Sequence, residues 1–165
     1  MKTRDLVIGA LLTALALIIP IFFGSYLRIY IPPFSATLAS HVPTMIAFLI
    51  SPAVAIMVGL GSSLGFLIMM GPVVAARAFI HVFFGLAGAL LVKKGFSFEK
   101  ALIATAPIHA IGEVLVVLPF GFTFNQALIM VGIGTLLHHT LDGVVAVVLA
   151  RLVLSGVKLA NNVSN

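Results

Sequence analysis

Residues 71–92 have the sequence GPVVAARAFIHVFFGLAGALLV, an apolar run with two strongly polar side chains inside it. The run is long enough to cross a bilayer as a helix, because a span needs about 20 apolar residues. Arg77 and His81 are four positions apart, so they lie on one face of that helix. A cation at membrane depth is costly and by default marks a functional site. The stretch therefore predicts a transmembrane helix that carries part of a ligand site.

Two later apolar runs repeat this construction. His109 and Glu113 are four positions apart in the next run, and His138 and Asp142 are four positions apart in the last one. Each pair shares one helix face. We therefore expect the three polar faces to converge on a ligand pocket inside a bundle of membrane helices.

The composition is that of an integral membrane protein. Of the 165 residues 62% are hydrophobic and only 8% are charged, whereas ordinary soluble domains are about 25% charged. One compact domain over residues 1–165 is the natural count. The absence of cysteine excludes disulfides, thiolate metal sites and cysteine nucleophiles. The net charge of +5 does not indicate nucleic-acid binding, because most basic residues lie at the ends of apolar runs.

The apolar runs predict an all-α integral membrane protein, a six-transmembrane-helix bundle. The expected spans cover residues 6–23, 38–50, 53–70, 73–92, 101–118 and 127–154. The first run is longer than the apolar core of a signal peptide, so we expect it to remain in place as a span. The second run is short for a full crossing, which indicates a tilted or partly extended segment.

Basic residues predict the orientation of the bundle. With six crossings, the basic residues before the first span, those in the loop at residues 93–100 and those at the end of the last span fall on one side. The other side carries only Arg28. The positive-inside rule then places both termini in the cytoplasm and the loop after the first span outside.

Small residues line one strip of the first span. Gly9, Ala10, Thr13 and Ala14 form a smooth surface without polar ligand groups. Such surfaces let helix backbones approach each other in lipid. Internal packing is the commoner role of small residues, but this strip also suits docking of a helix from a partner protein.

The chain resembles the niacin-type substrate-binding subunits, or S-components, of energy-coupling factor (ECF) vitamin transporters. The resemblance rests on an AxxxA step at Ala10 and Ala14 and on the stretches RIYIPPFSATLASHVP, SPAVAIMVGLGSSLGF and GPVVAARAFIH. It implies high-affinity binding of a small vitamin, with nicotinate the best candidate, from outside the cell by the first loop and spans four to six. It also implies a transmembrane coupling protein, which contacts Ala10 and Ala14, and two ATPase subunits. The chain has no GxxxxGK[ST] phosphate loop, which agrees with ATP hydrolysis by other subunits and with a non-enzymatic role here.

Arg77 and Glu113 are expected at similar depths in the outer part of the membrane. They form either a packing ion pair or a site in which Arg77 holds a substrate carboxylate by a two-pronged contact and Glu113 orients it. His81, His109 and His138 are either satisfied core residues or hydrogen-bonding partners of the ligand. We favour His138 over His139 for the pocket because His138 shares a helix face with Asp142.

The outer loop predicts a lid over a planar ring. Tyr26, Tyr30 and Phe34 surround Pro32-Pro33, which stiffens the loop, although aromatic residues at this level often only anchor the membrane interface. His41 and Asn125 lie near the outer mouth and are weaker candidates for ligand contact.

Four other functions compete with this interpretation: an S-component for another vitamin or precursor, a metal-ion transporter subunit, a membrane enzyme and a self-contained carrier. Five histidines favour the metal transporter. The lack of cysteine and of a histidine-rich loop argues against it, and Arg77 would repel a cation. We therefore expect neither a metal nor a cofactor. HEXXH is absent, since the stretch from His109 to Glu113 is HAIGE, and no catalytic arrangement stands out.

Overall fold

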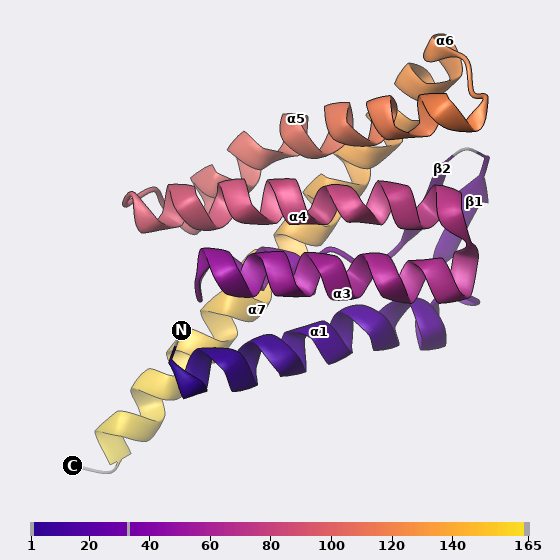
Figure 1. Ribbon diagram of the computed structural model, residues 1–165. Coiled ribbons are helices and arrows are strands. Elements are labelled where there is room, and N and C mark those ends of the chain that lie inside the picture. Colours follow the sequence, from indigo (N-terminus) through magenta and orange to yellow (C-terminus); the bar gives the residue numbers. More distant parts are fainter. Residues whose placement is uncertain (1, 33, 164–165) are drawn as a thin grey trace.

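The computed structural model describes residues 2–32 and 34–163, which form a bundle of long helices (Figure 1). In that part of the chain, five helical stretches are long and apolar enough to cross a membrane. They are α1 (Thr3–Phe23), α3 (Pro52–Met70), α4 (Pro72–Lys93), α5 (Phe98–Val117) with the short 3₁₀ turn η1 (Leu118–Phe120), and a last stretch. The last stretch comprises α6 (Phe124–Gln126), the π-helical segment η2 (Ala127–Ile133) and α7 (Gly134–Val163). The expectation of an all-α membrane protein is confirmed.

Capping residues and prolines set the helix boundaries. Ser51 accepts a hydrogen bond from the backbone of Val54, and Pro52 begins α3, where its missing N–H costs nothing. Gly71 has a φ of 80°, a conformation that favours glycine, and it breaks the chain between α3 and α4. Ser97 caps α5 in the same way as Ser51 caps α3.

The expected second span over residues 38–50 is not among the five candidate membrane helices in the described part of the chain. The chain instead forms a hairpin of β1 (Arg28–Ile31) and β2 (Phe34–Thr37), then a turn, and then α2 (Val42–Ala47), which has only six residues. Ala39 in this turn has a φ of 67°, which a right-handed helix does not contain. Pro33, expected to stiffen the loop, lies outside the described residues.

The segment from β2 to the start of α3 nevertheless runs the length of the bundle. Figure 1 shows α1 running from the end opposite the hairpin towards the hairpin, and α3 running in the same direction. Residues 34–51 must therefore return from one end to the other between them. Within a membrane the backbone polar groups of such a segment need partners from the protein, and several of these partners belong to the candidate site.

Glycines bring the first helices into close contact. A Cβ atom on Gly59 of α3 would lie 2.7 Å from the backbone nitrogen of Val82, so the backbones of α3 and α4 touch. Gly61 and Gly65 of α3 pack against the side chains of Thr13 and Leu17 of α1. Small residues allow such close crossings in lipid, and they make α1, α3 and α4 a tightly packed unit.

The small-residue strip of α1 is divided between two faces. Gly9 is buried against Met57, and Thr13 packs over Gly61, so these two residues face α3. Ala10 is exposed and Ala14 is half-buried. The part of the strip that remains open to a partner is therefore Ala10 with Ala14.

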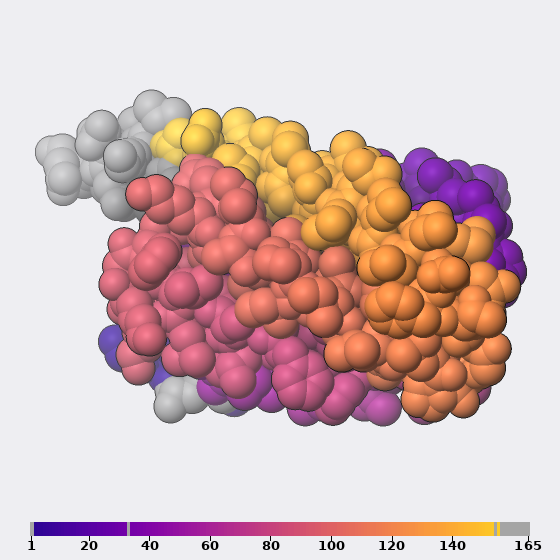
Figure 2. Space-filling view, turned by 90° about the horizontal axis from the view of Figure 1, so that it is seen from above, coloured from indigo at the N-terminus to yellow at the C-terminus, as the bar shows by residue number. Residues whose placement is uncertain are grey.

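The opposite face of the bundle is formed by α5 and α7, which cover most of the view in Figure 2. The two helices diverge along part of their length and leave an apolar groove that Leu102, Ile103 and Val147 help to line. The polar side chains of the candidate site lie deeper, between these helices, α4 and β2.

Candidate functional site

Arg77 of α4 and Glu113 of α5 form a buried ion pair. Glu113 Oε2 accepts hydrogen bonds from Arg77 Nη2 at 2.7 Å and from Arg77 Nε at 3.1 Å. Thr135 of α7 donates its hydroxyl to the same oxygen. The two charged residues are 3% and 2% exposed. The pair therefore fixes the plane of the guanidinium where three helices meet.

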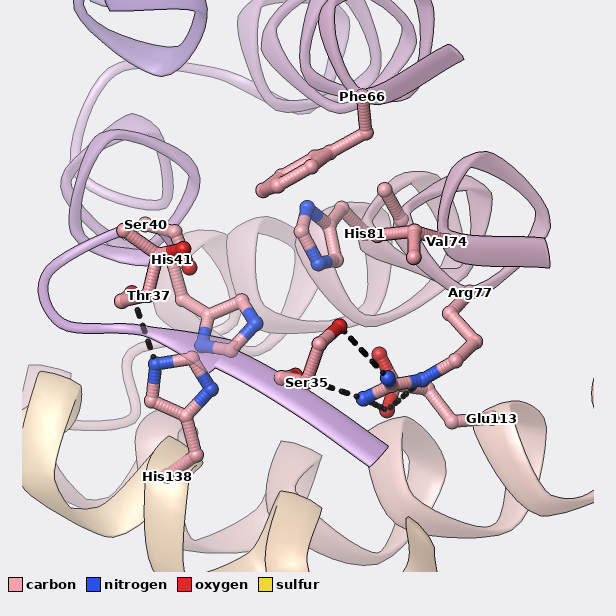
Figure 3. Close-up of a pocket in the computed structure, with 11 residues that line it drawn as sticks. Ser35, Thr37, Ser40, His41, Phe66, Val74, Arg77, His81, Glu113 and His138 are labelled. Carbon is pink, nitrogen blue, oxygen red and sulfur yellow. Dashed lines mark hydrogen bonds and ion pairs between the residues drawn. The ribbon is translucent and has the colours of Figure 1, made fainter. Parts of the chain in front are cut away.

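The same guanidinium also holds the hairpin. Arg77 Nη1 donates to Ser35 Oγ at 3.1 Å, and Arg77 Nη2 donates to the Ser35 carbonyl at 3.2 Å (Figure 3). The Arg77 Cζ atom lies 5.4 Å from the centre of the Phe34 ring, within the range of a cation–π contact. Phe34 in turn packs on Gly134, where an added Cβ would lie 2.6 Å from the ring. Arg77 therefore connects β2 to the helices on both sides of it.

Asp142 of α7 holds the turn that follows β2. Its Oδ1 accepts from the backbone N–H of Ala39 at 2.7 Å, and its Oδ2 accepts from the backbone N–H of His41 at 3.0 Å. The His41 ring nitrogen Nδ1 lies 3.0 Å from Oδ2, and His138 Nε2 lies 3.3 Å from it. Asp142 is fully buried. Its carboxylate thus supplies the partners that the non-helical backbone of this turn requires.

Histidines from four elements gather next to these two acids. The ring centre of His41 lies 4.7 Å from that of His81, 4.6 Å from that of His109 and 4.2 Å from that of His138. His139 lies on the other side of His109, and their Nδ1 atoms are 3.0 Å apart. All five rings are buried. The cluster is therefore a continuous set of imidazoles within the bundle.

A small cavity separates the hairpin side of this cluster from α3 and α4 (Figure 3). Its volume is about 20 Å³, which is enough for roughly one water molecule. Its wall includes Ser35, Thr37 and Ser40 on the hairpin side and Phe66, Arg77, His81 and Glu113 on the helix side. Thr37 is 2% exposed, and its hydroxyl finds no hydrogen-bond partner among the described residues. The cavity is polar and able to offer hydrogen bonds to a small polar molecule.

A curated relative identifies the family. The niacin transporter NiaX of Lactococcus lactis subsp. cremoris (strain MG1363) is 35% identical over 158 residues, and the alignment covers 86% of this chain and 70% of the relative. The chain belongs to the niacin-type ECF S-components. No family model matches the chain, and no solved structure matches it. The S-component resemblance of the sequence is thereby confirmed, and the chain is a transport subunit of a prokaryotic plasma membrane that crosses the membrane several times.

The fold of this S-component brings most of the expected site residues together. The predicted pairs and two loop residues lie within one connected set of side chains, which comprises Phe34, His41, Arg77, His81, His109, Glu113, His138 and Asp142. Of the two adjacent histidines, His138 borders the cavity, and its Nε2–H donates to the Thr37 carbonyl at 3.0 Å. His139 instead points to the Leu102 carbonyl at 3.0 Å.

Three other expected residues lie away from the cavity. Tyr26 and Tyr30 of the outer loop are 86% and 58% exposed, so their rings do not cover the cavity of the S-component. Asn125 is exposed in α6. Tyr30 instead packs beneath Arg28, whose Cζ atom is 5.4 Å from the ring centre.

The small hydroxyl residues of β2 and the turn were not predicted as site residues from the sequence. Ser35 and Thr37 are both buried, whereas their neighbours Phe34 and Ala36 are half-buried. This alternation is the period of a strand, in which every second side chain points to the same face. The pattern was available in the stretch FSAT, but the apolar residues around it obscured the strand.

Proposed function

We propose that this S-component captures nicotinate from outside the cell and delivers it inward as part of an ECF importer. The relative NiaX is a niacin transporter. The observation that carries the proposal is the state of Arg77, a buried guanidinium that is oriented by Glu113 and bonded to neutral oxygens of Ser35 at the cavity wall. This arrangement suits a ligand with one carboxylate.

In the proposed complex, the carboxylate of nicotinate replaces Ser35 as the acceptor at Arg77. Glu113 keeps its bonds to Nε and Nη2 and so holds the guanidinium in place. Hydrogen bonds between an arginine and a carboxylate are roughly twice as strong as bonds to neutral oxygens. The exchange is therefore favourable for an acid and less so for the corresponding amide.

The ring of the vitamin would lie between the hairpin wall and Phe66. The Thr37 hydroxyl is buried without a partner among the described side chains and can donate to the ligand. His41, His81 and Ser40 border the same space, and the Ser40 hydroxyl can hydrogen-bond to the pyridine nitrogen. An aromatic face and a few polar groups are the usual elements of a small-molecule site.

Entry of the ligand requires one wall to move. A cavity of about 20 Å³ holds roughly one water molecule, and a pyridine carboxylate is several times larger. The wall formed by α3 and α4 is held by backbone contact at Gly59. The β2 wall is held at Arg77 by bonds to Ser35, which the carboxylate can replace. We therefore assign β2 and the following turn as the side that opens.

The orientation of the bundle follows from the loop charges. The loop with Lys93 and Lys94 and both ends of the chain would lie in the cytoplasm, and the β1–β2 hairpin would lie outside. Cysteine labelling tests this directly because the chain has no native cysteine. Gly95→Cys should react only after the membrane is made permeable, and labelling of this variant on intact cells would reverse the orientation.

The transport cycle would require a transmembrane coupling protein and two ATPase subunits. Ala10 and Ala14 form the open, small-residue part of α1, and such a surface suits a close helix crossing. We propose that the coupling protein packs on this part of α1. The S-component would then supply the vitamin site, and its partners would supply the energy.

Calorimetric titration with nicotinate and nicotinamide tests the anchor. Arg77→Lys keeps the charge but loses the planar fork, so nicotinate affinity should fall by roughly thirty-fold or more. The affinity for nicotinamide should fall much less, because the amide makes no ion pair. Arg151→Lys is the matched control, since Arg151 also pairs with a glutamate, Glu99 at 2.9 Å, but is exposed.

The ratio of the two affinities decides between an anchor and a structural ion pair. If Arg77 only stabilises the bundle, its substitution damages the site for both ligands by the same factor. Arg77→Ala removes the charge, so an unchanged acid-to-amide ratio in Arg77→Ala would refute the proposed role of Arg77. Equal binding of acid and amide by the unsubstituted chain would refute nicotinate as the substrate.

A further inference from the structure

Four buried side chains of this S-component converge on one point. His41, His81, His109 and Glu113 each offer one nitrogen or oxygen atom, and these atoms all lie within 4.8 Å of one another. The four residues are at most 4% exposed. They come from the turn after β2, from α4 and from α5, so the convergence is a product of the fold.

The hydrogen bonds of His109 leave the lone pair of its Nε2 atom directed at the carboxylate of Glu113. His139 Nε2 lies 3.0 Å from the Leu102 carbonyl, which can only accept, so this nitrogen carries the proton. The Nδ1 of a neutral His139 must then accept, and His109 Nδ1, 3.0 Å away, must donate to it. A neutral His109 consequently has a bare Nε2, which lies 3.3 Å from Glu113 Oε1.

Two acceptors that face each other in a dry interior need a proton or a metal cation between them. His109 Nε2 is buried and has no hydrogen-bond partner among the described residues. Glu113 uses its other oxygen, Oε2, for Arg77 and Thr135. Oε1 is therefore directed at the cluster even though the ion pair with Arg77 is intact.

The other two histidines are oriented in the manner of metal ligands. His81 Nδ1 lies 3.0 Å from Ser62 Oγ, and His41 Nδ1 lies 3.0 Å from Asp142 Oδ2. Histidines that bind a metal almost always bond their second nitrogen to a carboxylate, a carbonyl or another polar group, which fixes the ring. Here His81 and His109 each have such a partner on one nitrogen, and His41 Nδ1 lies beside a carboxylate without a hydrogen bond to it, so each ring keeps its other nitrogen for a ligand.

The charge of the buried set also favours a cation. Among the described buried residues, Arg77 contributes one positive charge, and Glu113 and Asp142 contribute two negative charges. With neutral histidines the set therefore has a net charge of minus one inside the bundle. Uncompensated charge is costly in a low-dielectric interior.

We infer that His41, His81, His109 and Glu113 bind one divalent first-row transition-metal ion, with Zn²⁺ as the best fit. Three imidazoles and one carboxylate suit a four-coordinate Zn²⁺. With metal–ligand distances of about 2.1 Å, ligand atoms of a tetrahedral site lie about 3.4 Å apart. The ligand atoms lie at most 4.8 Å apart, so the side chains need to approach one another by at most about 1.4 Å. Arg77 does not oppose the ion, because Glu113 already neutralises it.

The ion would sit beside the vitamin cavity, and its effect there rests on the proposed function. A divalent ion changes the net charge of the buried set from minus one to plus one. A bound carboxylate then makes the site neutral, whereas without the ion it would leave two excess negative charges. Vitamin affinity should therefore depend on the metal.

Metal titration of the full chain, purified without a histidine tag, tests the site. Zn²⁺ should bind with a stoichiometry of one and raise the melting temperature, because a ligand that binds only the folded state stabilises it. Co²⁺ should give the intense visible bands of tetrahedral coordination, a readout that needs no variant. Absence of stoichiometric binding, or a Co²⁺ spectrum typical of octahedral coordination by oxygen ligands, would overturn the inference.

A pair of variants locates the ion. His81→Phe removes one ligand and should weaken Zn²⁺ binding at least about 100-fold. Loss of a residue that only hydrogen-bonds to a metal ligand already lowers metal affinity about 10–100-fold. Thr44→Val is the matched control, because Thr44 is equally buried and its hydroxyl has no partner among the described residues. Equal Zn²⁺ affinity in the two variants would place the ion elsewhere.

Nicotinate titration with and without Zn²⁺ separates this inference from the proposed function. Metal binding without any nicotinate binding would support the metal site and refute the proposed substrate. Nicotinate binding by a chain that takes up no Zn²⁺ would support the substrate and refute the metal site.

Discussion

The substitution Asp142→Asn should detach the turn between β2 and α2 from α7. The native carboxylate accepts from the backbone of Ala39 at 2.7 Å and from the backbone of His41 at 3.0 Å, one bond on each oxygen. Asparagine keeps one accepting oxygen and replaces the other with a donor. One of the two backbone N–H groups then faces an NH₂ group in a buried position.

The expected cost follows from these contacts. A hydrogen bond to a charged acceptor contributes about 1.5–3 kcal/mol, and a buried donor left without a partner costs about 1–3 kcal/mol. The two values describe partly the same loss and cannot simply be added. We therefore expect the free energy of unfolding to fall by about 2–4 kcal/mol. For a chain of 165 residues this corresponds to a melting temperature lowered by roughly 4–16 °C.

Ligand affinity should fall as well, since Thr37, Ser40 and His41 border the cavity on or beside the same turn. In the variant, ligand binding has to order the turn again. If this ordering costs about 1.4 kcal/mol of the binding free energy, the affinity decreases about tenfold. Thermal unfolding in detergent and calorimetric titration measure the two effects. Glu99→Gln, the same chemical change at a carboxylate whose side chain is 44% exposed, is the control. A melting temperature and an affinity indistinguishable from those of this control would refute the role of Asp142.

Three further predictions concern the packing of the helices and the turn. Ala39→Gly should raise the melting temperature slightly, because a φ of 67° costs alanine about 1 kcal/mol and costs glycine little; a lower value would show that the methyl group packs usefully. Gly59→Ala should destabilise the chain by about 1–3 kcal/mol because the new Cβ meets the backbone of α4 at 2.7 Å. Gly143→Ala, whose nearest neighbour would be 3.9 Å away, should be neutral or stabilising in the same melting experiment. Ala10→Leu and Ala14→Leu should prevent co-purification with the coupling protein but leave nicotinate titration unchanged, and loss of vitamin binding would contradict an external role for this strip.

Local periodicity was enough to predict which polar residues share a helix face. The spacing of His109 and Glu113 places both on one side of α5, and their side chains lie 3.3 Å apart. Contacts between helices did not follow from the spacing in the same way. Arg77 and Glu113 are separated by 36 positions, and the sequence was compatible both with an ion pair between them and with a ligand site. Helix periodicity fixes a face but does not fix which faces meet.

The departure of the second span from a helix has a long-range cause. The stretch from residue 38 to residue 50 is apolar enough to suggest a span, although it is short for a helix that crosses the membrane. Its first part is held in a turn by Asp142, which lies more than 100 positions later in the chain. An interaction at that separation outweighs the local preference, and it also explains why Thr37 and Ser40 were missed and why His41 received little weight.

The two sides of the cavity differ in how they are held, and this difference has a functional consequence. On one side, α3 and α4 are in backbone contact at Gly59, so displacing them means opening a close-packed interface. On the other side, the polar contacts of β2 and its turn include bonds from Arg77 to Ser35, from Asp142 to Ala39 and His41, and between His138 and Thr37. A polar ligand can replace such bonds one for one, whereas it cannot replace apolar packing. The side that yields to an incoming acid should therefore be the hairpin side, and the helices should keep Arg77 in place while it does.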